Sequence, residues 1–407
     1  MRSSANRRVL VWMCVLIAFN QLGFGSVVPV LPLYASSFGV SPAAIGLTIA
    51  VYGLARFLAA VPAGRAADRL GRRGTLAVGG LLTVLGNLLC ALAPSYPLFL
   101  GARFLAGAGA ALVLTAAQIV LVDITVPAER GRVMGIYSGV FAFAVGVGPY
   151  PGGLLAEHLG LNAPFLAYAG GGLIVAVLAW LRVPETRGRQ AFPTSHSSKP
   201  LPSFGQQMRL LALNTGFLLV CLVSFSAAVA RTGALFNVVP LLVSSRLDLA
   251  PDQIGLGLSL VSLGALLLAY PSGVLIDRFG RKAVIVPSTL VAGVSAGLFA
   301  VTPTYAWYLA ACAVWSIALG ISSDAPGAYA ADTAPPGMNA AVMSTYRMLS
   351  DAGYVLGPLA LGLLTDRAGA PAALAVAGVL LVGSGVLFGL FAAERYRPPS
   401  ASAWRAG

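Results

Sequence analysis

Long apolar stretches separated by short polar turns run along the whole chain. Each has about twenty or more residues, the length needed to cross the hydrocarbon core of a bilayer. To within a few residues they cover 9–34, 43–63, 74–93, 97–121, 133–156, 162–181, 210–240, 253–274, 283–302, 305–330, 340–364 and 371–392. This pattern predicts an all-α integral membrane protein with twelve transmembrane helices. The first stretch is too long for a signal-peptide core and no A-x-A cleavage site follows it, so we expect it to be retained.

One short polar turn occurs twice between neighbouring apolar stretches. Residues 64–73 read GRAADRLGRR and residues 273–282 read GVLIDRFGRK, an offset of 209 positions. The same offset relates further pairs of identical residues, among them Asp123 and Asp332, Tyr137 and Tyr346, and Gly148-Pro149 and Gly357-Pro358. A duplication of this length predicts two homologous halves, related by an axis along the membrane normal.

A polar stretch separates the two halves. Residues 182–209 form the longest non-apolar run and hold four prolines, a composition typical of a flexible linker. The predicted organisation is an N-terminal six-helix bundle at 1–181, a cytoplasmic linker at 182–209, a C-terminal six-helix bundle at 210–393 and a cytoplasmic tail at 394–407.

Composition and charge agree with a membrane protein. Hydrophobic residues make up 58% of the chain and charged residues only 10%, too few to cover a soluble surface of this size. The net charge of +13 does not indicate a nucleic-acid partner. If the N-terminus is cytoplasmic, 20 of the 26 Lys and Arg lie on the cytoplasmic side, and only Arg246 and Arg367 lie in outer loops. This asymmetry follows the positive-inside rule and predicts a plasma-membrane protein with both termini in the cytoplasm.

The sequence offers no catalytic or cofactor chemistry. The spacing of the four cysteines matches no metal site, and each lies in a different apolar stretch. No phosphate-binding G-x-x-x-x-G-K-[ST] loop occurs, which argues against direct ATP drive. We therefore expect no enzyme activity, no metal and no cofactor.

The doubled loop, with the pattern G-x-x-x-D-R-x-G-R-[RK], resembles the signature of the major facilitator superfamily. The resemblance covers essentially the whole chain and implies twelve helices in two pseudo-symmetric six-helix bundles. It also implies that the loop latches the outward-facing state, with Asp123 bonding to a loop arginine in a cluster of Asp68, Arg72 and Asp123. The arginines could instead only enforce topology. The implied latch residues are Gly64, Asp68, Arg69, Gly71, Arg72, Arg73 and Asp123, and Gly273, Asp277, Arg278, Gly280 and Arg281 in the second copy.

Residues 139–153, GVFAFAVGVGPYPGG, form a second signature. So much glycine and proline in a membrane helix is costly unless close packing or a kink uses it. The run resembles the antiporter motif of the family's exporters. The alternative is ordinary small-residue helix packing, and both interpretations can hold together. Its motif positions are Gly139, Gly146, Gly148, Pro149, Gly152 and Gly153. RFLAGAGAA, starting at Arg103, resembles a motif linked to proton coupling, and Pro184-Glu185-Thr186 is another family-like ending.

Six ionisable residues fall inside the predicted spans. Each costs roughly 2.5–3.5 kcal/mol near the bilayer centre, so we expect them to face a cavity or to pair. They are Arg56, Arg103, Arg231, Asp324, Arg347 and Asp351. Arg347 and Asp351, four residues apart on one helix, could form an ion pair. Asp324 is our preferred proton-coupling residue, because no Arg lies within one turn of it on its own helix.

Several polar or amphipathic residues inside the spans could line a substrate cavity, or could equally make packing hydrogen bonds. They are Asn20, Gln21, Tyr52, Gln118, Tyr137, Asn237 and Tyr346.

The leading hypothesis is a proton-coupled efflux antiporter for small molecules or drugs, most like the twelve-helix drug:proton antiporter branch. It would function as a monomer in the lipid bilayer, by alternating access of a midplane site. The alternative is an organic-anion or other metabolite symporter or uniporter of the same fold, since four arginines and only two aspartates lie within the spans. A non-transporting receptor is disfavoured because we see no appended soluble domain.

Overall fold

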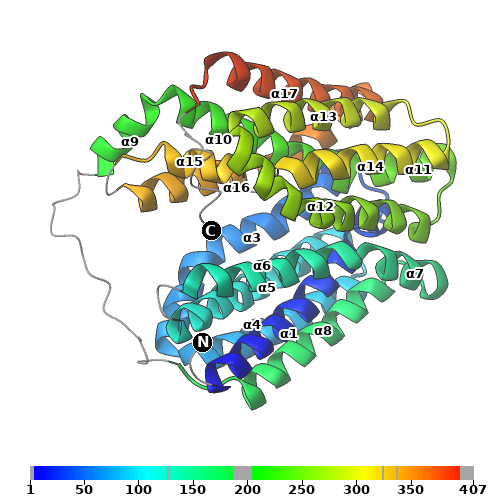
Figure 1. Ribbon diagram of the computed structural model, residues 1–407. Helices are drawn as coiled ribbons and strands as arrows, with labels where there is room; N and C mark the ends of the chain where they lie inside the picture. Colours follow the sequence, from blue (N-terminus) through cyan, green and yellow to red (C-terminus); the bar gives the residue numbers. More distant parts are fainter. Residues whose placement is uncertain (1–3, 126–128, 187–203, 323–324, 336–337, 395–407) are drawn as a thin grey trace. The chain divides into compact units, whose positions relative to one another are not determined.

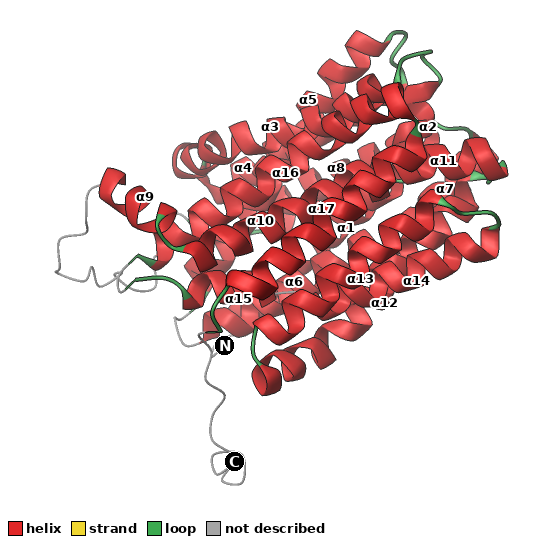
Figure 2. Cartoon of the chain, turned by 90° about the horizontal axis from the view of Figure 1, so that it is seen from above, coloured by secondary structure: helices red, strands yellow, loops and turns green. Residues whose placement is uncertain are grey.

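The computed structural model describes residues 4–125, 129–186, 204–322, 325–335 and 338–394. Within these residues every regular element is a helix, and twelve helices or helix runs are long and apolar enough to cross a membrane (Figure 2). They coincide with the twelve predicted stretches, with ends that differ by at most seven residues, so the predicted all-α membrane fold is confirmed.

Several spans are built from more than one helix. The elements are α1 (Ser4–Val27), α2 (Leu31–Ser36), α3 (Pro42–Arg69), α4 (Gly71–Ala91), α5 (Tyr96–Ile124), α6 (Arg130–Val147), α7 (Pro149–Leu159), α8 (Ala163–Arg182), α9 (Phe204–Ala212), α10 (Thr215–Val229), the π-helix Ala230–Val238, α11 (Val239–Leu247), α12 (Pro251–Phe279), α13 (Lys282–Ala300), α14 (Tyr305–Ser322), α15 (Ala325–Asp332), α16 (Asn339–Ala368) and α17 (Ala370–Phe391). Figure 1 follows them in chain order.

Two differences from the predicted segments have local causes. The first predicted stretch, 9–34, is interrupted after Val27, because Pro29 and Pro32 each lack the N–H that a continuous helix needs. The last residues of the predicted linker are helical, since α9 starts at Phe204.

The chain divides into two compact units. Unit 1 comprises Met1–Ser195 and Phe236–Leu263, and unit 2 comprises His196–Leu235 and Gly264–Gly407. Residues 236–263 of the predicted C-terminal bundle thus belong to unit 1. The bundle boundaries at 181 and 210 stay a prediction.

Glycines allow close helix packing in unit 1. A Cβ at Gly86 would lie 2.5 Å from the backbone nitrogen of Ala106 on α5, and a Cβ at Gly80 would lie 2.7 Å from that of Ala176 on α8. Between membrane helices, such close approach supplies the van der Waals contact that replaces the hydrophobic driving force. Helix α4 is therefore held tightly between α5 and α8.

Unit 2 repeats this use of glycine. A Cβ at Gly233 in the π-helix would lie 2.5 Å from the carbonyl oxygen of Gly357 on α16. Its core contains Phe217, Tyr329 and Phe388, with the last two rings edge to face at 4.9 Å.

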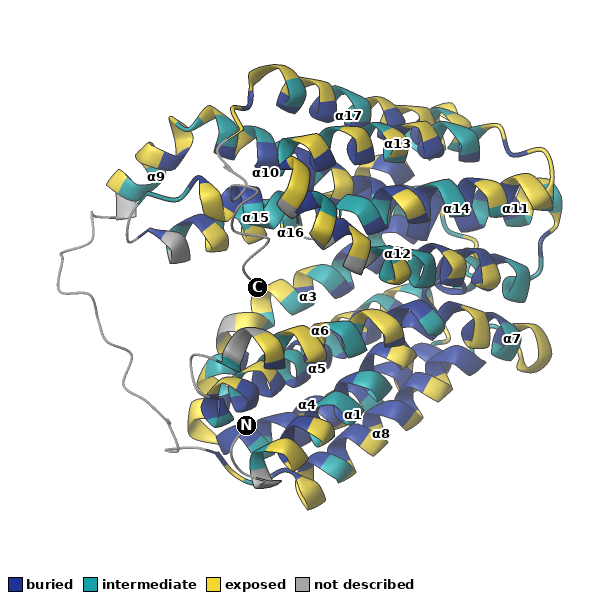
Figure 3. Ribbon diagram, viewed as in Figure 1, coloured by how far each residue is buried: buried dark blue, intermediate teal, exposed yellow. Residues whose placement is uncertain are grey.

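Many large apolar residues are exposed. Examples are Leu267 at 78%, Val379 at 72% and Leu390 at 70% exposure. Figure 3 draws the exposed residues of every kind in yellow. Exposed apolar surface of this extent fits contact with lipid.

Candidate functional site

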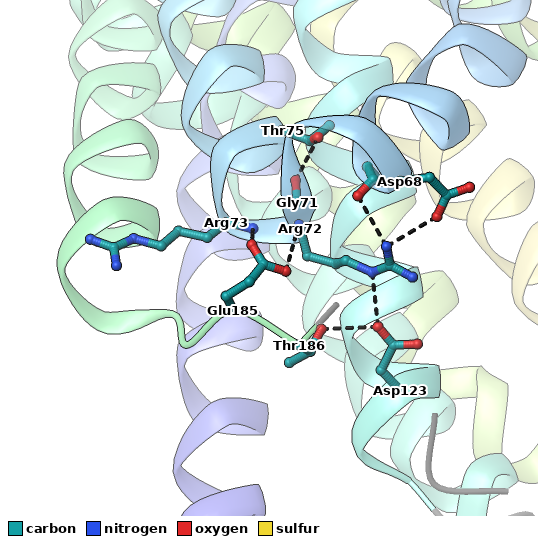
Figure 4. A network of polar contacts seen from close by, with 9 residues as sticks. Asp68, Gly71, Arg72, Arg73, Thr75, Asp123, Glu185 and Thr186 are labelled. Atoms are coloured by element: carbon teal, nitrogen blue, oxygen red, sulfur yellow. Dashed lines mark hydrogen bonds and ion pairs between the residues drawn. The ribbon is translucent and has the colours of Figure 1, made fainter. Parts of the chain in front are cut away.

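A buried arginine organises one end of unit 1 (Figure 4). The side chain of Arg72 is 8% exposed, and its Nε donates to Asp123 Oδ2 at 3.0 Å. Its Nη1 donates to Asp68 Oδ1 and to the Ala67 carbonyl, both at 3.0 Å. Thr186 adds a hydroxyl donor to Asp123 Oδ2 at 2.9 Å. The structure thus brings together the predicted cluster of Asp68, Arg72 and Asp123, from three different helices.

Glu185 completes this arrangement, and the sequence did not predict its role. Its carboxylate accepts from the backbone N–H groups of Arg72 at 3.0 Å and Arg73 at 3.3 Å. N–H groups in the first turn of a helix have no partner within the helix, and a negative charge beside them is favoured. The Glu185 carboxylate provides both the acceptor and the charge at the start of α4. Gly71 has φ +82°, and a Cβ there would overlap the Glu185 carboxylate. We call Asp68, Gly71, Arg72, Arg73, Asp123, Glu185 and Thr186 the Arg72 clasp.

A second, looser copy lies in unit 2. Arg281 Nε donates to Asp332 Oδ2 at 3.3 Å, and Arg281 Nη1 donates to the Ile276 carbonyl at 3.3 Å. Glu394 accepts from the backbone N–H of Lys282 at 2.7 Å, beside Gly280 with φ +90°. We call these residues the Arg281 clasp.

Each residue of the Arg281 clasp lies 209 positions after its counterpart in the Arg72 clasp. The 209-residue offset between Glu185 and Glu394 was the sequence signal that could have identified both carboxylates.

The remaining predicted latch residues are less buried. Arg69 and Arg278 are exposed and Gly64 is half-buried. Gly273 and Asp277 lie on α12, and their burial and side-chain contacts are outside the described part of the structure. A latch role for either clasp stays a prediction.

The antiporter-like segment packs closely within unit 1. A Cβ at Gly148 would lie 2.7 Å from the Gly25 Cα on α1, and a Cβ at Gly152 would overlap the Ser26 backbone. A Cβ at Gly146 would lie 3.0 Å from the Ser262 Cβ, and a Cβ at Gly153 would lie 2.6 Å from the Asp252 Cα. Gly139 has no atom within 4 Å of such a Cβ. Pro149 begins α7, so its missing N–H costs no hydrogen bond there.

Several polar groups are buried within unit 1. Arg103 is 2% exposed, and its guanidinium carbon lies 4.5 Å from the centre of the Tyr52 ring. Arg103 Nη1 finds no hydrogen-bond partner among the described residues, and neither do Oδ1 and Nδ2 of the fully buried Asn20. The hydroxyl of Tyr137 is likewise buried without a partner in the described part of the chain.

The other predicted cavity residues of unit 1 differ in burial. Gln21 and Asn237 are buried, Arg56 is half-buried and Gln118 is exposed.

Unit 2 encloses a pocket of about 260 Å³. Arg231 on the π-helix and Tyr346 on α16, both predicted, line it together with Ser224 and Trp315. Ser224 donates to the Tyr346 hydroxyl at 2.8 Å. Arg231 is the charged member of the described lining, and most of the other members are small, hydroxyl-bearing or aromatic.

Sequence reasoning missed Ser224 and Trp315. The spacing of Tyr346, Ser350 and Tyr354, which share one helix face, was the available signal for more of this lining.

Two of the predicted charges lie on α16. Arg347 and Asp351 are both exposed, and an ion pair between them stays a prediction. Asp324, the preferred coupling residue, lies outside the described residues.

Comparison with known proteins identifies the family. The family model described as Major Facilitator Superfamily matches residues 13–230 and 217–406. The chain belongs to this superfamily. It is therefore a multi-pass membrane transporter for small molecules rather than an enzyme.

Several of its relatives within the superfamily are named as multidrug resistance proteins. It is 25% identical to multidrug resistance protein 2 of Bacillus subtilis, over 90% of this chain and 91% of the relative. It is 23% identical to an uncharacterized MFS-type transporter of Methanocaldococcus jannaschii, over 86% and 89% of the two chains. A solved bacterial homolog of the human lysosomal transporter Spinster superposes with a TM-score of 0.79 at 17% identity, covering 98% of this chain and all of the other, and shows the shared fold.

Proposed function

We propose that this superfamily member is a proton-coupled exporter of small molecules that works by alternating access. The similarity to a multidrug resistance protein along 90% of the chain carries the proposal. The glycine-rich contacts of residues 139–153, which resemble an antiporter motif, support the export direction. Its site of action is the plasma membrane, with both termini cytoplasmic and a monomer as the working unit.

The two clasps serve as the switching elements. The Arg72 clasp joins the end of α3, the start of α4 and the end of α5 to the residues that follow α8. Within it the Arg72–Asp68 bond is the exposed one, since Asp68 is 73% exposed and Asp123 only 6%. Water competes with exposed ion pairs, so the Arg72–Asp68 bond breaks first while the Arg72–Asp123 bond stays intact.

The unit 2 pocket holds part of the substrate. Its 260 Å³ is below the roughly 300–1,000 Å³ typical of complete sites for drug-sized ligands. Trp315 offers an aromatic face, and the Tyr346 hydroxyl and Arg231 offer polar contacts that orient one end of the molecule. A substrate with a flat apolar body and one polar end matches this lining.

Asp324 and Asp351 are the proposed proton-coupling carboxylates. In everted vesicles, an acid interior should drive uptake of chloramphenicol or a cationic dye, and Asp324→Asn or Asp351→Asn should abolish pH-driven uptake while leaving binding measurable. Asp248→Asn is the matched control: Asp248 is exposed and has φ 51°, which Asn tolerates. Uptake that is indifferent to the pH gradient, or both variants at full rate, would contradict the proposal.

An organic-anion carrier remains the second candidate, because Arg231 is the charged group among the described pocket lining. A tenfold or greater loss of affinity on Arg231→Gln, limited to anionic ligands and reversed by Arg231→Lys, would favour it over export of drugs.

A further inference from the structure

A basic hollow lies at the Arg72-clasp end of unit 1, outside the sites described above. It has a volume of about 450 Å³ and is lined by Arg7, Arg8, Val11, Trp12 and Arg182. Arg7 and Val11, like Arg8 and Trp12, are four residues apart, so α1 presents both pairs on neighbouring parts of one face. The guanidinium carbon of Arg182, from α8, lies 5.2 Å from the centre of the Trp12 ring. Three guanidinium groups from two helices therefore surround one open space.

No carboxylate among the described residues forms an ion pair with the arginines of this hollow. All three arginines are exposed. The Arg72 clasp at the same end shows the opposite arrangement, where Asp68 and Asp123 share one guanidinium. Charge complementarity therefore favours an anionic ligand in the hollow.

The hollow sits where the apolar spans end. The span of α1 begins at Asn6 and the span of α8 ends at Arg182, so the arginines lie at the depth of lipid headgroups. Apolar side chains are exposed just inside this level, with Val11 at 53% and Leu181 at 67%. Tryptophan favours this boundary because its ring is amphipathic.

A second guanidinium–indole pair marks the same boundary. The guanidinium carbon of Arg73 lies 4.4 Å from the centre of the Trp180 ring, and Trp180 is 56% exposed. The hollow thus combines a cationic rim with an apolar flank. A soluble anion would use only the rim, whereas a phospholipid would use both.

We propose that this hollow binds the headgroup of an anionic phospholipid, with its phosphate against Arg7, Arg8 and Arg182 and its acyl chains along Val11 and Leu181. Guanidinium groups bind phosphate oxygens in bidentate geometry, and basic pockets between membrane helices bind anionic headgroups. The inference depends neither on the transported substrate nor on the direction of transport, because the hollow lies on the surface of unit 1 and not in the unit 2 pocket.

The test measures lipid binding to the purified full-length protein. Native mass spectrometry should detect retained phosphatidylglycerol, and phosphatidylglycerol should raise the melting temperature in detergent more than phosphatidylcholine does. Arg7→Gln/Arg8→Gln/Arg182→Gln should weaken phosphatidylglycerol binding by roughly tenfold or more, because each basic residue near an anionic surface contributes to attraction. The corresponding triple Lys variant, which keeps the charge but loses the planar fork, should bind at intermediate strength.

A charge-matched variant provides the control. Arg65→Gln/Arg132→Gln/Arg209→Gln removes three exposed arginines that do not line the hollow, and it should bind phosphatidylglycerol as the unaltered protein does. Three outcomes would overturn the proposal: equal loss in both triple variants, equal binding of phosphatidylcholine, or complete competition by millimolar glycerol phosphate. The last would indicate a site for free phosphate. If Arg7→Gln/Arg8→Gln/Arg182→Gln is poorly produced, Arg182→Gln alone replaces it, because this variant leaves α1 unchanged. Its phosphatidylglycerol binding is then compared with that of the unaltered protein, and unchanged binding overturns the proposal.

Discussion

Removing Arg72 should destabilise unit 1 far more than the equivalent change destabilises unit 2. In Arg72→Gln the carboxylate of Asp123, whose side chain is 6% exposed, loses its cationic partner and retains the Thr186 hydroxyl. Breaking one side of a buried ion pair costs about 3–5 kcal/mol. In Arg281→Gln the carboxylate that loses its partner is that of Asp332, whose side chain is 33% exposed. Its distance from Arg281 Nε is also longer, at 3.3 Å. Water can replace that partner, so the cost should be about 1 kcal/mol or less.

Thermal unfolding of the purified variants in one detergent measures this difference. With about 2–4 °C per kcal/mol for a unit of this size, the melting temperature should fall by roughly 6–20 °C for Arg72→Gln and by roughly 4 °C or less for Arg281→Gln. The double variant Arg72→Gln/Asp123→Asn removes both buried charges and should recover part of the loss. Equal shifts for the two arginine variants, or no recovery in the double variant, would refute the assignment of the stability to the buried Arg72–Asp123 pair.

Three further outcomes follow from the geometry. Gly71→Ala should lower the melting temperature, since a side chain at φ +82° is strained by roughly 1–2 kcal/mol and its Cβ displaces the Glu185 carboxylate from the start of α4; an unchanged melting temperature would contradict this. Gly152→Ala should cost about 1–3 kcal/mol by overpacking against α1, whereas Gly139→Ala, with open space around it, should be neutral in the same thermal assay. Trp315→Leu should weaken binding of aromatic substrates about tenfold in a fluorescence titration without a comparable loss for aliphatic ones, and equal losses would remove Trp315 from the substrate contact.

The sequence predicted the membrane spans because their signal is local. Twenty consecutive apolar residues determine a spanning helix whatever its neighbours do. The π-helix at Ala230–Val238 was not predictable in this way, since its extra residue per turn depends on packing, such as the contact of Gly233 with Gly357.

Among the residues of the candidate site, the charged ones could be predicted from the sequence. Charged residues inside or beside a span are rare and therefore informative, which is why Arg72, Asp123 and Arg231 were identified. Ser224 and Trp315 resemble ordinary span residues, and only the rotation of their helices places them at the pocket. An ion pair between Arg347 and Asp351 stays a prediction, because a spacing of four residues allows such a contact without fixing the directions of the two side chains.

The glycine contacts of α4 have a practical consequence for measuring motion. Backbones that approach as closely as those at Gly80 and Gly86 cannot slide or rotate past their neighbours without collision. Helices α4, α5 and α8 therefore form a fixed frame. Spin labels on exposed positions of α4 and α8 should keep one separation under every condition, and would serve as the internal ruler against which all other distance changes in the transporter are calibrated.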